Sequence, residues 1–529
     1  MQKVYHNVRV ILSLAKRMVK QKLLQVLMCL YPHSWHGKEH FIQDTRGDSD
    51  LVSEDSLAEK IFIILEMAEL KDKIKCLDIG IGWEIIGSLI KEKGCFSSVI
   101  GFNKNAIEQA KEKWPGIEFT NIDPLKFCPR DKFERIFMIN VVEHLPRKYL
   151  IKLLKKCFDW LADDGVIIIH TPERNQESNA SAHFYPEHIN LLNIEDLKNM
   201  FEKLSFKIED MFALPTNSSG QPEGIFCRIS KRKDHFAGTD TVNTLIEYYV
   251  TLGDTVCLTG VMREYKKAHP NERIFVKTLY PELFYHNPLV EDSVISIPDH
   301  KFGKVFKIDY RGFPERRTKH LVDVIAEQTK INLVPETRTP DIFIKNYEEN
   351  IFERRFKLSK SKTIVVLAPH SRWASRNWIE DRWKKVGEYL IDKYDVCLMQ
   401  VGQNSESYLG VGNNWLGLTD VRTLAILLKK SFAFVSVDNG VHHLSAAVGT
   451  PGIVLFGPVY SKFRAYKDIT YPVEANFGCR GCFHKDDWPW QKPPRVCPLG
   501  TYECMKNITV SSVMETIDML MEKRKDAGR

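Results

Sequence analysis

The sequence lacks several features that would place it in a special class of protein. No apolar run reaches the roughly 18 residues that a membrane-spanning helix needs. No low-complexity segment and no repeat of about 20–50 residues is present, which argues against solenoid and propeller folds. The formal net charge of +7 is small for 529 residues, so we expect no nucleic-acid partner.

The twelve cysteines form no regular disulfide framework, and no secretory signal precedes them. Thiols in such a pattern are typical of a reducing compartment, so we expect a cytoplasmic protein with free or metal-bound cysteines. The composition, 43% hydrophobic and 27% charged, is that of an ordinary globular protein. A chain of this length exceeds one hydrophobic core, which predicts about two to four domains.

Residues 1–31 form a basic segment without a single acidic side chain. Its apolar side chains recur at helical spacing, which predicts an amphipathic helix. An anionic membrane surface attracts such a helix, so the segment predicts peripheral binding at the inner membrane. A helix docked on the next domain is the alternative.

Residues 45–232 have the order of a Rossmann-like α/β domain. A strand at 74–79 runs into Asp78, Gly80 and Gly82, a second strand ends at Asn103, and a third strand–helix junction presents Asp123. Glycines between a strand and a helix let the backbone approach a ligand closely. We therefore expect a ligand at these strand ends.

Two further segments, VEHL at 142–145 and the stretch 187–206, complete a pattern that resembles class I S-adenosylmethionine-dependent methyltransferases over residues 53–232. The resemblance implies that the methionine part of the cofactor lies against Asp78, Gly80 and Gly82. It places the ribose near Asn103 and the adenine near Asp123. The third glycine of the family pattern is replaced by Glu84 here, and a degenerate domain that serves as a scaffold is the alternative.

The methyl acceptor of an active domain would be a sugar hydroxyl or carboxyl group. His144, His183 and His188 are the candidates for the base, because a histidine titrates near neutral pH. Each histidine has a purely structural, hydrogen-bonding role as its alternative.

The most informative stretch is FVSVDNGVHHLSAAVGTPGIVLFGP, from 434 to 458. It predicts a buried strand at 434–437, a polar turn at Asp438-Asn439-Gly440, a helix at 442–448 and a second strand at 452–456. Polar groups thus lie at the carboxyl end of a strand, where open α/β sheets bind ligands. An ordinary strand–helix–strand unit whose Asp438 caps the helix is the alternative.

The sequence of this stretch resembles the nucleotide-sugar motif of glycosyltransferase family 9, the lipopolysaccharide heptosyltransferases. That motif reads D-[TS]-G-x-x-H-L-x-A-A-x-G-x-P, followed by L-F-G-P. The resemblance implies that Asp438, Asn439, Gly440 and His443 bind the diphosphate-sugar at a helix N-terminus, so no metal ion is required there. It extends over residues 243–525.

Two other sites follow from the same resemblance. Asp254 comes after the first strand of this half and corresponds to the general base, with a helix N-cap as its alternative. Ser371, Ser375 and Arg376 stand where the family holds hydroxyl residues and a lysine against the diphosphate. The guanidinium fork of Arg376 suits phosphate, and a surface arginine is the alternative.

Four cysteines near the end of the chain, Cys479, Cys482, Cys497 and Cys504, have a spacing that fits a tetrahedral zinc or iron site. Similar cysteines occur in an iron-containing subgroup of the glycosyltransferase family. Free buried thiols are the alternative.

The sequence therefore predicts a methyltransferase-like domain (45–232), a linker (233–242) and a GT-B glycosyltransferase with an acceptor lobe (243–350) and a donor lobe (351–529). We expect an inverting transfer of a sugar from a nucleotide donor such as ADP-heptose to a cell-surface glycan or glycolipid. The alternatives are a glycan methyltransferase whose second half only recognises glycan, and a non-catalytic scaffold.

Overall fold

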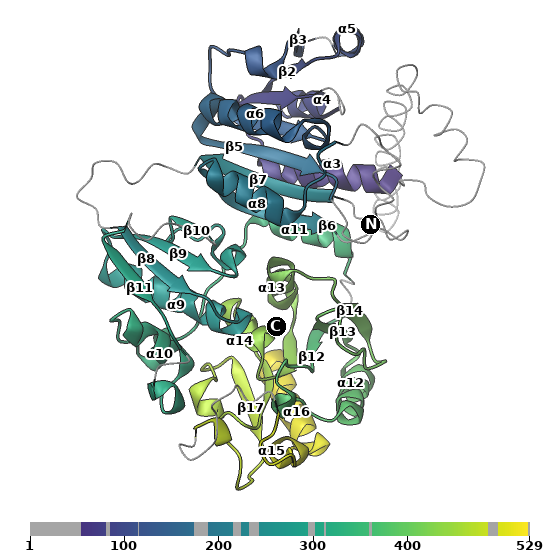
Figure 1. The fold of residues 1–529 in the computed structure, drawn as a ribbon. Helices are drawn as coiled ribbons and strands as arrows, with labels where there is room; N and C mark the ends of the chain where they lie inside the picture. The colour runs from purple at the N-terminus through teal and green to yellow at the C-terminus, as the bar shows by residue number, and fades with distance from the viewer. Residues whose placement is uncertain are drawn as a thin grey trace.

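The computed structural model describes residues 54–80, 85–114, 116–173, 189–214, 224–231, 243–294, 302–310, 314–358, 362–484 and 496–526. The predicted basic helix 1–31, the linker 233–242, Gly82, Glu84, His183 and His188 lie outside these residues. Three β-sheets organise the described part of the chain (Figure 1). They confirm the predicted α/β fold class.

The first sheet has seven strands in the order β3-β2-β1-β4-β5-β7-β6, and only β7 runs antiparallel to its neighbours. Its strands are β1 (Lys75–Ile79), β2 (Phe96–Gly101), β3 (Glu118–Asn121), β4 (Phe133–Ile139), β5 (Leu161–Thr171), β6 (Phe206–Leu214) and β7 (Gly224–Lys231). The accompanying helices are α3 (Glu54–Ala68), α4 (Ile85–Glu92), α5 (Lys104–Lys113), α6 (Arg147–Trp160) and α8 (Ile194–Lys203).

Both faces of this sheet are covered, as the continuous apolar runs of its central strands require. Along β4, Ile136 and Met138 belong to a core with α6 and α8. Phe137 and Ile139 point to the opposite face and belong to a core with α3 and α4. Alternation along the strand thus serves two hydrophobic layers.

The second and third sheets are parallel and belong to the C-terminal half. The second has the order β10-β9-β8-β11, with β8 (Asn243–Tyr248), β9 (Arg273–Thr278), β10 (Asp292–Val294) and β11 (Lys304–Lys307). The third has the order β14-β13-β12-β15-β16-β17, with β12 (Ile364–Ala368), β13 (Cys397–Gly402), β14 (Asn413–Leu416), β15 (Ala433–Val437), β16 (Gly452–Phe456) and β17 (Thr470–Glu474).

The helices of this half are α9 (Leu252–Ala268), α10 (Leu321–Gln328), α11 (Asn346–Phe356), α12 (Glu380–Tyr394), α13 (Val421–Lys430), α14 (Gly440–Ala447), α15 (Glu503–Lys506) and α16 (Val510–Asp526). One hydrophobic cluster runs from the second sheet into the third and includes Ile246, Val256, Phe434 and Phe456. The two lobes therefore share a continuous core.

The connecting segment between the lobes contains α11, so the predicted boundary at 350 falls inside a helix. The helix starts after Lys345, whose backbone N–H donates to Glu348, and it ends at Lys357 in the left-handed region with φ +42. Its apolar side chains Tyr347 and Ile351 belong to the same hydrophobic cluster as α3 of the first domain. In Figure 1, α11 lies between the first sheet and the other two.

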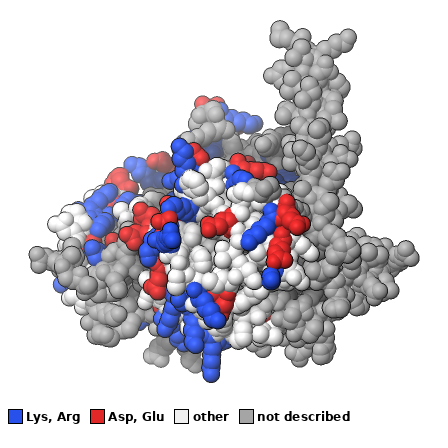
Figure 2. Space-filling view, turned by 90° about the horizontal axis from the view of Figure 1, so that it is seen from above, with Lys and Arg blue, Asp and Glu red and all other residues white. Residues whose placement is uncertain are grey.

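Basic and acidic side chains are interspersed over the face of the molecule seen in Figure 2. Such mixing agrees with the modest net charge of +7. Within the described residues, no helix combines the length and the apolar character needed to cross a bilayer.

Candidate active sites

The two lobes of the C-terminal half meet where the N-terminus of α9 packs against the N-terminus of α14. Both contacting positions are glycines. A Cβ atom at Gly253 would lie 2.8 Å from His443 Cδ2 and 3.3 Å from the Cα atom of Gly440. Glycine at 253 therefore permits a contact distance that a side chain would prevent.

Asp254 lies in the first turn of α9, at the carboxyl end of β8. The N-cap of the helix is Thr251, so the alternative that Asp254 is the N-cap is wrong. The Thr251 hydroxyl donates to Asp254 Oδ2 at 2.8 Å. Burial raises the pKa of Asp254 above its usual range, against the opposing effects of Thr251 and nearby guanidinium groups. A carboxylate with a raised pKa is a stronger base.

On the donor-lobe side of this junction, Arg376 and Asp438 form a largely buried pair. Arg376 Nη1 lies 3.3 Å from Asp438 Oδ2 and donates to the Asp438 backbone carbonyl at 3.0 Å. The guanidinium also stacks on Trp373, 4.0 Å from the ring centroid. Its Nε–H is buried and has no hydrogen-bond partner among the described residues. One donor of Arg376 therefore remains available at this strand end.

A second guanidinium, that of Arg464, is buried beside this pair, and no pattern in the sequence predicted it. Arg464 Nη2 donates to the Tyr310 hydroxyl at 2.5 Å. Burial opposes its charge, but Tyr310, Asp438 and Asp254 raise the pKa of Arg464. Its influence on the pKa of Asp254 shows that the cations and carboxylates of the two lobes lie in one electrostatic environment.

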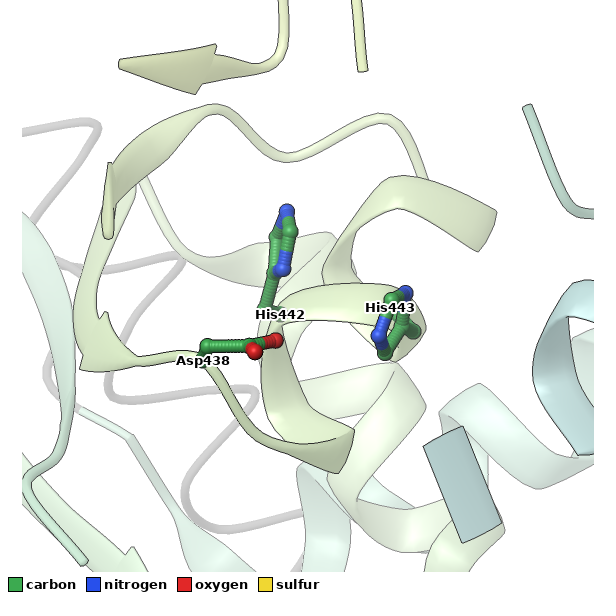
Figure 3. Close-up of side chains that lie close together, drawn as sticks. All are labelled: Asp438, His442 and His443. Carbon is green, nitrogen blue, oxygen red and sulfur yellow. The ribbon is translucent and has the colours of Figure 1, made fainter. Parts of the chain in front are cut away.

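Asp438 points toward the first turn of α14, beside the rings of His442 and His443 (Figure 3). The donor atoms of these three residues lie within 4.8 Å of one another, a spacing that metal ligands also have. Each residue already has a partner, however. Arg376 pairs with Asp438, His442 Nε2 lies 2.8 Å from the Thr470 hydroxyl, and His443 Nδ1 lies 2.7 Å from the Tyr466 hydroxyl.

Burial disfavours the charged form of both histidines. Burial lowers the pKa of His442 to about 4 and holds the pKa of His443 well below its usual range. Cys257 Sγ of α9 lies 3.5 Å from His443 Nδ1, so the predicted donor-binding histidine is located at the junction of the lobes. It is buried there as part of a network with Tyr466.

Asn439 is the N-cap of α14. Its Oδ1 accepts hydrogen bonds from the Val441 and His442 N–H groups, and its Nδ2 donates to the carbonyls of Ala368 and His370. This side chain thus joins the end of β12 to the turn after β15. It sets the direction in which the N-terminus of α14 points.

The two predicted serines lie in different surroundings. Ser371 is half-buried, and its hydroxyl accepts a hydrogen bond from the Trp373 N–H at 3.3 Å. Ser375 is buried and lines a small cavity together with Cys479, Cys482, Cys497 and Cys504. The structure therefore brings Arg376 to Asp438 and places Ser375 beside the cysteines.

That cavity has a volume of about 10 Å³, roughly the space of one water molecule or ion. Burial raises the pKa of the Cys504 thiol to about 12, and the other three cysteines add to the shift. Thiolates are ligands of structural zinc and iron sites, so these four side chains supply donor atoms of a suitable kind.

In the first domain, Asp78 and Gly80 lie at the carboxyl end of β1. Burial raises the pKa of Asp78 to about 8. Gly80 has φ +114, and a Cβ atom there would lie 2.6 Å from Val141 Cγ2. The chain therefore needs glycine to leave the end of β1 in this direction, because any side chain there would be strained and would collide with Val141.

Asn103 and Asp123 follow the neighbouring strands. Asn103 is exposed at the start of α5. Asp123 Oδ1 accepts hydrogen bonds from the Tyr149 hydroxyl at 2.5 Å and the Leu125 N–H at 2.9 Å, and Tyr149 lowers the pKa of Asp123. The exposed Phe102, which precedes Asn103, has its ring centroid 5.9 Å from that of Tyr149. An aromatic platform thus accompanies the two predicted cofactor residues.

Among the predicted histidine bases, His144 is described, and it is exposed after β4. Its neighbour Glu143 is 1% exposed, and burial raises the pKa of Glu143 to about 7. The Thr171 hydroxyl donates to Glu143 at 3.1 Å. A carboxyl group that titrates near neutral pH at the end of β4 was not foreseen, because its burial depends on the fold.

Comparison with known proteins finds a family model that matches part of each half. Residues 321–489 match the family model of glycosyltransferase family 9 (heptosyltransferase), and residues 57–210 match that of a methyltransferase domain. The chain is 28% identical over 153 residues to a phosphoethanolamine N-methyltransferase of Plasmodium falciparum, which covers 27% of this chain and 58% of the relative. It is 27% identical over 130 residues to lipopolysaccharide heptosyltransferase 1 of Pseudomonas aeruginosa, which covers 23% of this chain and 36% of the relative.

Solved structures resemble each half at low identity. The iron-containing dodecameric glycosyltransferase TibC from enterotoxigenic E. coli matches at 15% identity and a TM-score of 0.46, over 54% of this chain and 80% of TibC. The N-methyltransferase NodS from Bradyrhizobium japonicum, in complex with S-adenosyl-L-homocysteine, matches at 15% identity and a TM-score of 0.29, over 34% of this chain and 90% of NodS. The chain spans at most 58% of the length of either curated relative, the N-methyltransferase or the heptosyltransferase. It joins a methyltransferase domain to a heptosyltransferase-like domain of glycosyltransferase family 9.

Proposed function

We propose that the C-terminal half is an inverting glycosyltransferase that moves a sugar, heptose, from ADP-heptose to a lipopolysaccharide-type or other cell-surface glycan. The observation that supports this proposal is the arrangement at the junction of the lobes. Asp254 on the acceptor lobe shares one electrostatic environment with Asp438, Arg376 and Arg464. A base and a cluster of cations are the two components that such a transfer needs.

In this mechanism, Asp254 removes the proton from an acceptor hydroxyl. The acceptor oxygen then forms a bond to the anomeric carbon from the face opposite the diphosphate, and the bond from that carbon to the diphosphate oxygen breaks. Arg376 and Arg464 stabilise the negative charge that develops on the leaving diphosphate. Inversion follows from the single displacement.

We further propose that the N-terminal domain methylates the same glycan. Asp78, Gly80, Gly82, Asn103 and Asp123 would hold S-adenosylmethionine, which supplies an electrophilic methyl group when bound. Gly80 lies at the carboxyl end of β1, the edge of the sheet at which α/β domains bind their ligands. His144 and Glu143, both located after β4, are the described candidates for the group that accepts the proton of the methyl acceptor.

For the four-cysteine cavity, we propose a structural zinc or iron ion held by Cys479, Cys482, Cys497 and Cys504. The ion would cross-link the segment after β17 to α15, and would take no part in the transfer itself. We also propose that the protein works in the cytoplasm at the inner membrane, on the basis of the basic segment 1–31.

Replacement of Asp254 by Asn tests the glycosyltransferase proposal. The substitution keeps the size of the side chain but removes the base, so sugar transfer should fall by about 10²–10⁴-fold. Binding of ADP, measured by titration calorimetry, should remain as in the unaltered protein. A transfer rate unchanged by Asp254→Asn would remove Asp254 from the mechanism, and failure of the unaltered protein to bind ADP would refute the donor assignment.

A further inference from the structure

A cavity of about 570 Å³ lies where the methyltransferase domain meets both lobes of the glycosyltransferase half. The edge strand β6 forms one wall with Asp210–Leu214. Helix α11 and the start of α13 form the opposite walls, and Glu282 and Tyr285 of the acceptor lobe contribute as well. The walls thus come from the first domain and from both lobes together. The volume is that of an ordinary small-molecule site.

Two of the three sheets direct their ligand-binding edges at this cavity. Strands β5 and β6 run in the same direction, because both are antiparallel to β7. Glu173 follows the end of β5, and Leu214 is the last residue of β6, so both lie at the carboxyl ends of their strands. On the other side, residues 417–420 follow the end of β14. Carboxyl ends of parallel strands are the positions at which α/β domains bind their ligands. The cavity therefore lies at the carboxyl ends of edge strands of two sheets, β6 in the first and β14 in the third.

The side chains of the cavity disfavour a phosphorylated or nucleotide ligand. Five acidic side chains line it against three basic ones. Arg422 and Glu348 pair with each other through two contacts of 2.6 and 2.8 Å, which leaves four acidic and two basic side chains. Burial raises the pKa of Asp210, of Glu282 and of Glu173. Carboxyl groups accept hydrogen bonds from hydroxyl groups whether or not they are protonated. They suit a ligand rich in hydroxyl groups.

Aromatic rings supply the complementary apolar surface. Phe212 on β6, Tyr285 in the acceptor lobe and Phe356 on α11 all line the cavity. Phe356 is held in place by Trp415, with ring centroids 4.6 Å apart. Aromatic faces next to carboxyl groups match the two kinds of surface that a sugar presents, its C–H faces and its hydroxyl edges.

From this geometry we propose that the junction cavity binds an uncharged oligosaccharide segment of the acceptor, and that one bound acceptor is thereby held within reach of both transferase domains. This inference rests on the proposed function, because it assumes that the acceptor is a glycan. It adds a binding site at a place that neither transferase domain contains by itself.

Two substitutions fill the cavity from opposite walls. Ala213→Trp acts from β6 and Thr423→Trp acts from α13, and both positions are half-buried. Ser511→Trp, at an exposed position on α16, is the matched control. The full-length protein and each variant would be applied to an array of neutral and phosphorylated di- to tetrasaccharides. Binding of ADP and of S-adenosylhomocysteine to each variant, measured by calorimetry, reports that both domains remain folded.

We expect neutral oligosaccharides to bind the unaltered protein and the Ser511→Trp control, and to bind both cavity variants about tenfold more weakly. A bound oligosaccharide should also slow hydrogen exchange in residues 210–214 and 417–423 of the unaltered protein. The proposal is overturned if neither cavity variant loses affinity, if phosphorylated saccharides bind more tightly than neutral ones, or if exchange in these segments is unchanged. A protein that binds oligosaccharide at the cavity but does not bind ADP would instead refute the proposed function.

Discussion

The buried ion pair between Arg422 and Glu348 allows a quantitative test of how the parts of this protein hold together. Arg422 of α13 contacts Glu348 of α11 with two nitrogen–oxygen distances of 2.6 and 2.8 Å. It also donates to the carbonyls of Glu282 and Phe343 at 2.9 and 2.6 Å. Only 7% of the Arg422 side chain and 6% of the Glu348 side chain are exposed. One guanidinium thus connects the donor lobe, the connecting helix and the acceptor lobe.

Arg422→Met removes these contacts and leaves the Glu348 carboxylate buried without its partner. Removal of one partner from a buried ion pair costs about 3–5 kcal/mol of unfolding free energy. The pair Lys429–Glu349 joins the same two helices at 2.5 Å, but 49% of the Lys429 side chain is exposed. An exposed pair contributes about 0–1 kcal/mol, so Lys429→Met is a matched control. We expect the two substitutions to differ by about 2–5 kcal/mol.

Urea unfolding of the full-length protein, followed by tryptophan fluorescence, measures this difference through the shift in the transition midpoint. The double variant Arg422→Met with Glu348→Met should recover part of the loss, because no charge then remains buried. Equal midpoints for Arg422→Met and Lys429→Met would refute the reasoning. They would mean that water reaches Glu348 despite its burial.

Further predictions concern the sites themselves. Gly253→Ala should weaken sugar transfer and lower the free energy of unfolding by about 1–3 kcal/mol, because the new methyl group would collide with α14. Gly87→Ala is the control, because a methyl group there would meet other atoms only at ordinary contact distances of 3.4 Å or more. It should lower the free energy of unfolding by less in the same assay. Burial raises the pKa of Asp254, so sugar transfer at low substrate concentration should rise with pH through that pKa, and a flat profile over the acidic range would contradict a base at this position. Burial also raises the pKa of Asp210 in the folded state, so this group favours folding at low pH. That contribution to the free energy of unfolding is lost as pH rises above about 4, the pKa of an aspartate in the unfolded chain. Asp210→Asn should flatten this part of the pH–stability profile. Cys504→Ser should lower the zinc or iron content of the purified protein, measured by elemental analysis, whereas equal metal content would exclude Cys504 as a ligand.

The regular elements with strong local patterns could be predicted from the sequence, and the positions of lone polar residues could not. The strand at 452–456 was predicted with its observed bounds, because a run of apolar residues between a proline and a glycine is unambiguous. Helix α11 was not predicted, since its few apolar side chains become a face only when they meet α3. Arg464 was missed for a similar reason. Nothing near it in the sequence shows that Tyr310, more than a hundred residues away, would hold it in the active site.

The packing of α11 has a practical consequence for anyone who wishes to separate the two enzymes. Tyr347 and Ile351 are 3% and 5% exposed, and they complete a hydrophobic cluster that otherwise consists of residues from the first domain. A fragment that stops at 232 would lose these two side chains and expose the part of α3 that packs against α11. Such a fragment should aggregate, whereas its co-expression with a second fragment that begins at 243 should give a soluble complex of the two pieces. The two transferase domains are separate in sequence, but two side chains of the glycosyltransferase half form part of the hydrophobic core of the methyltransferase domain.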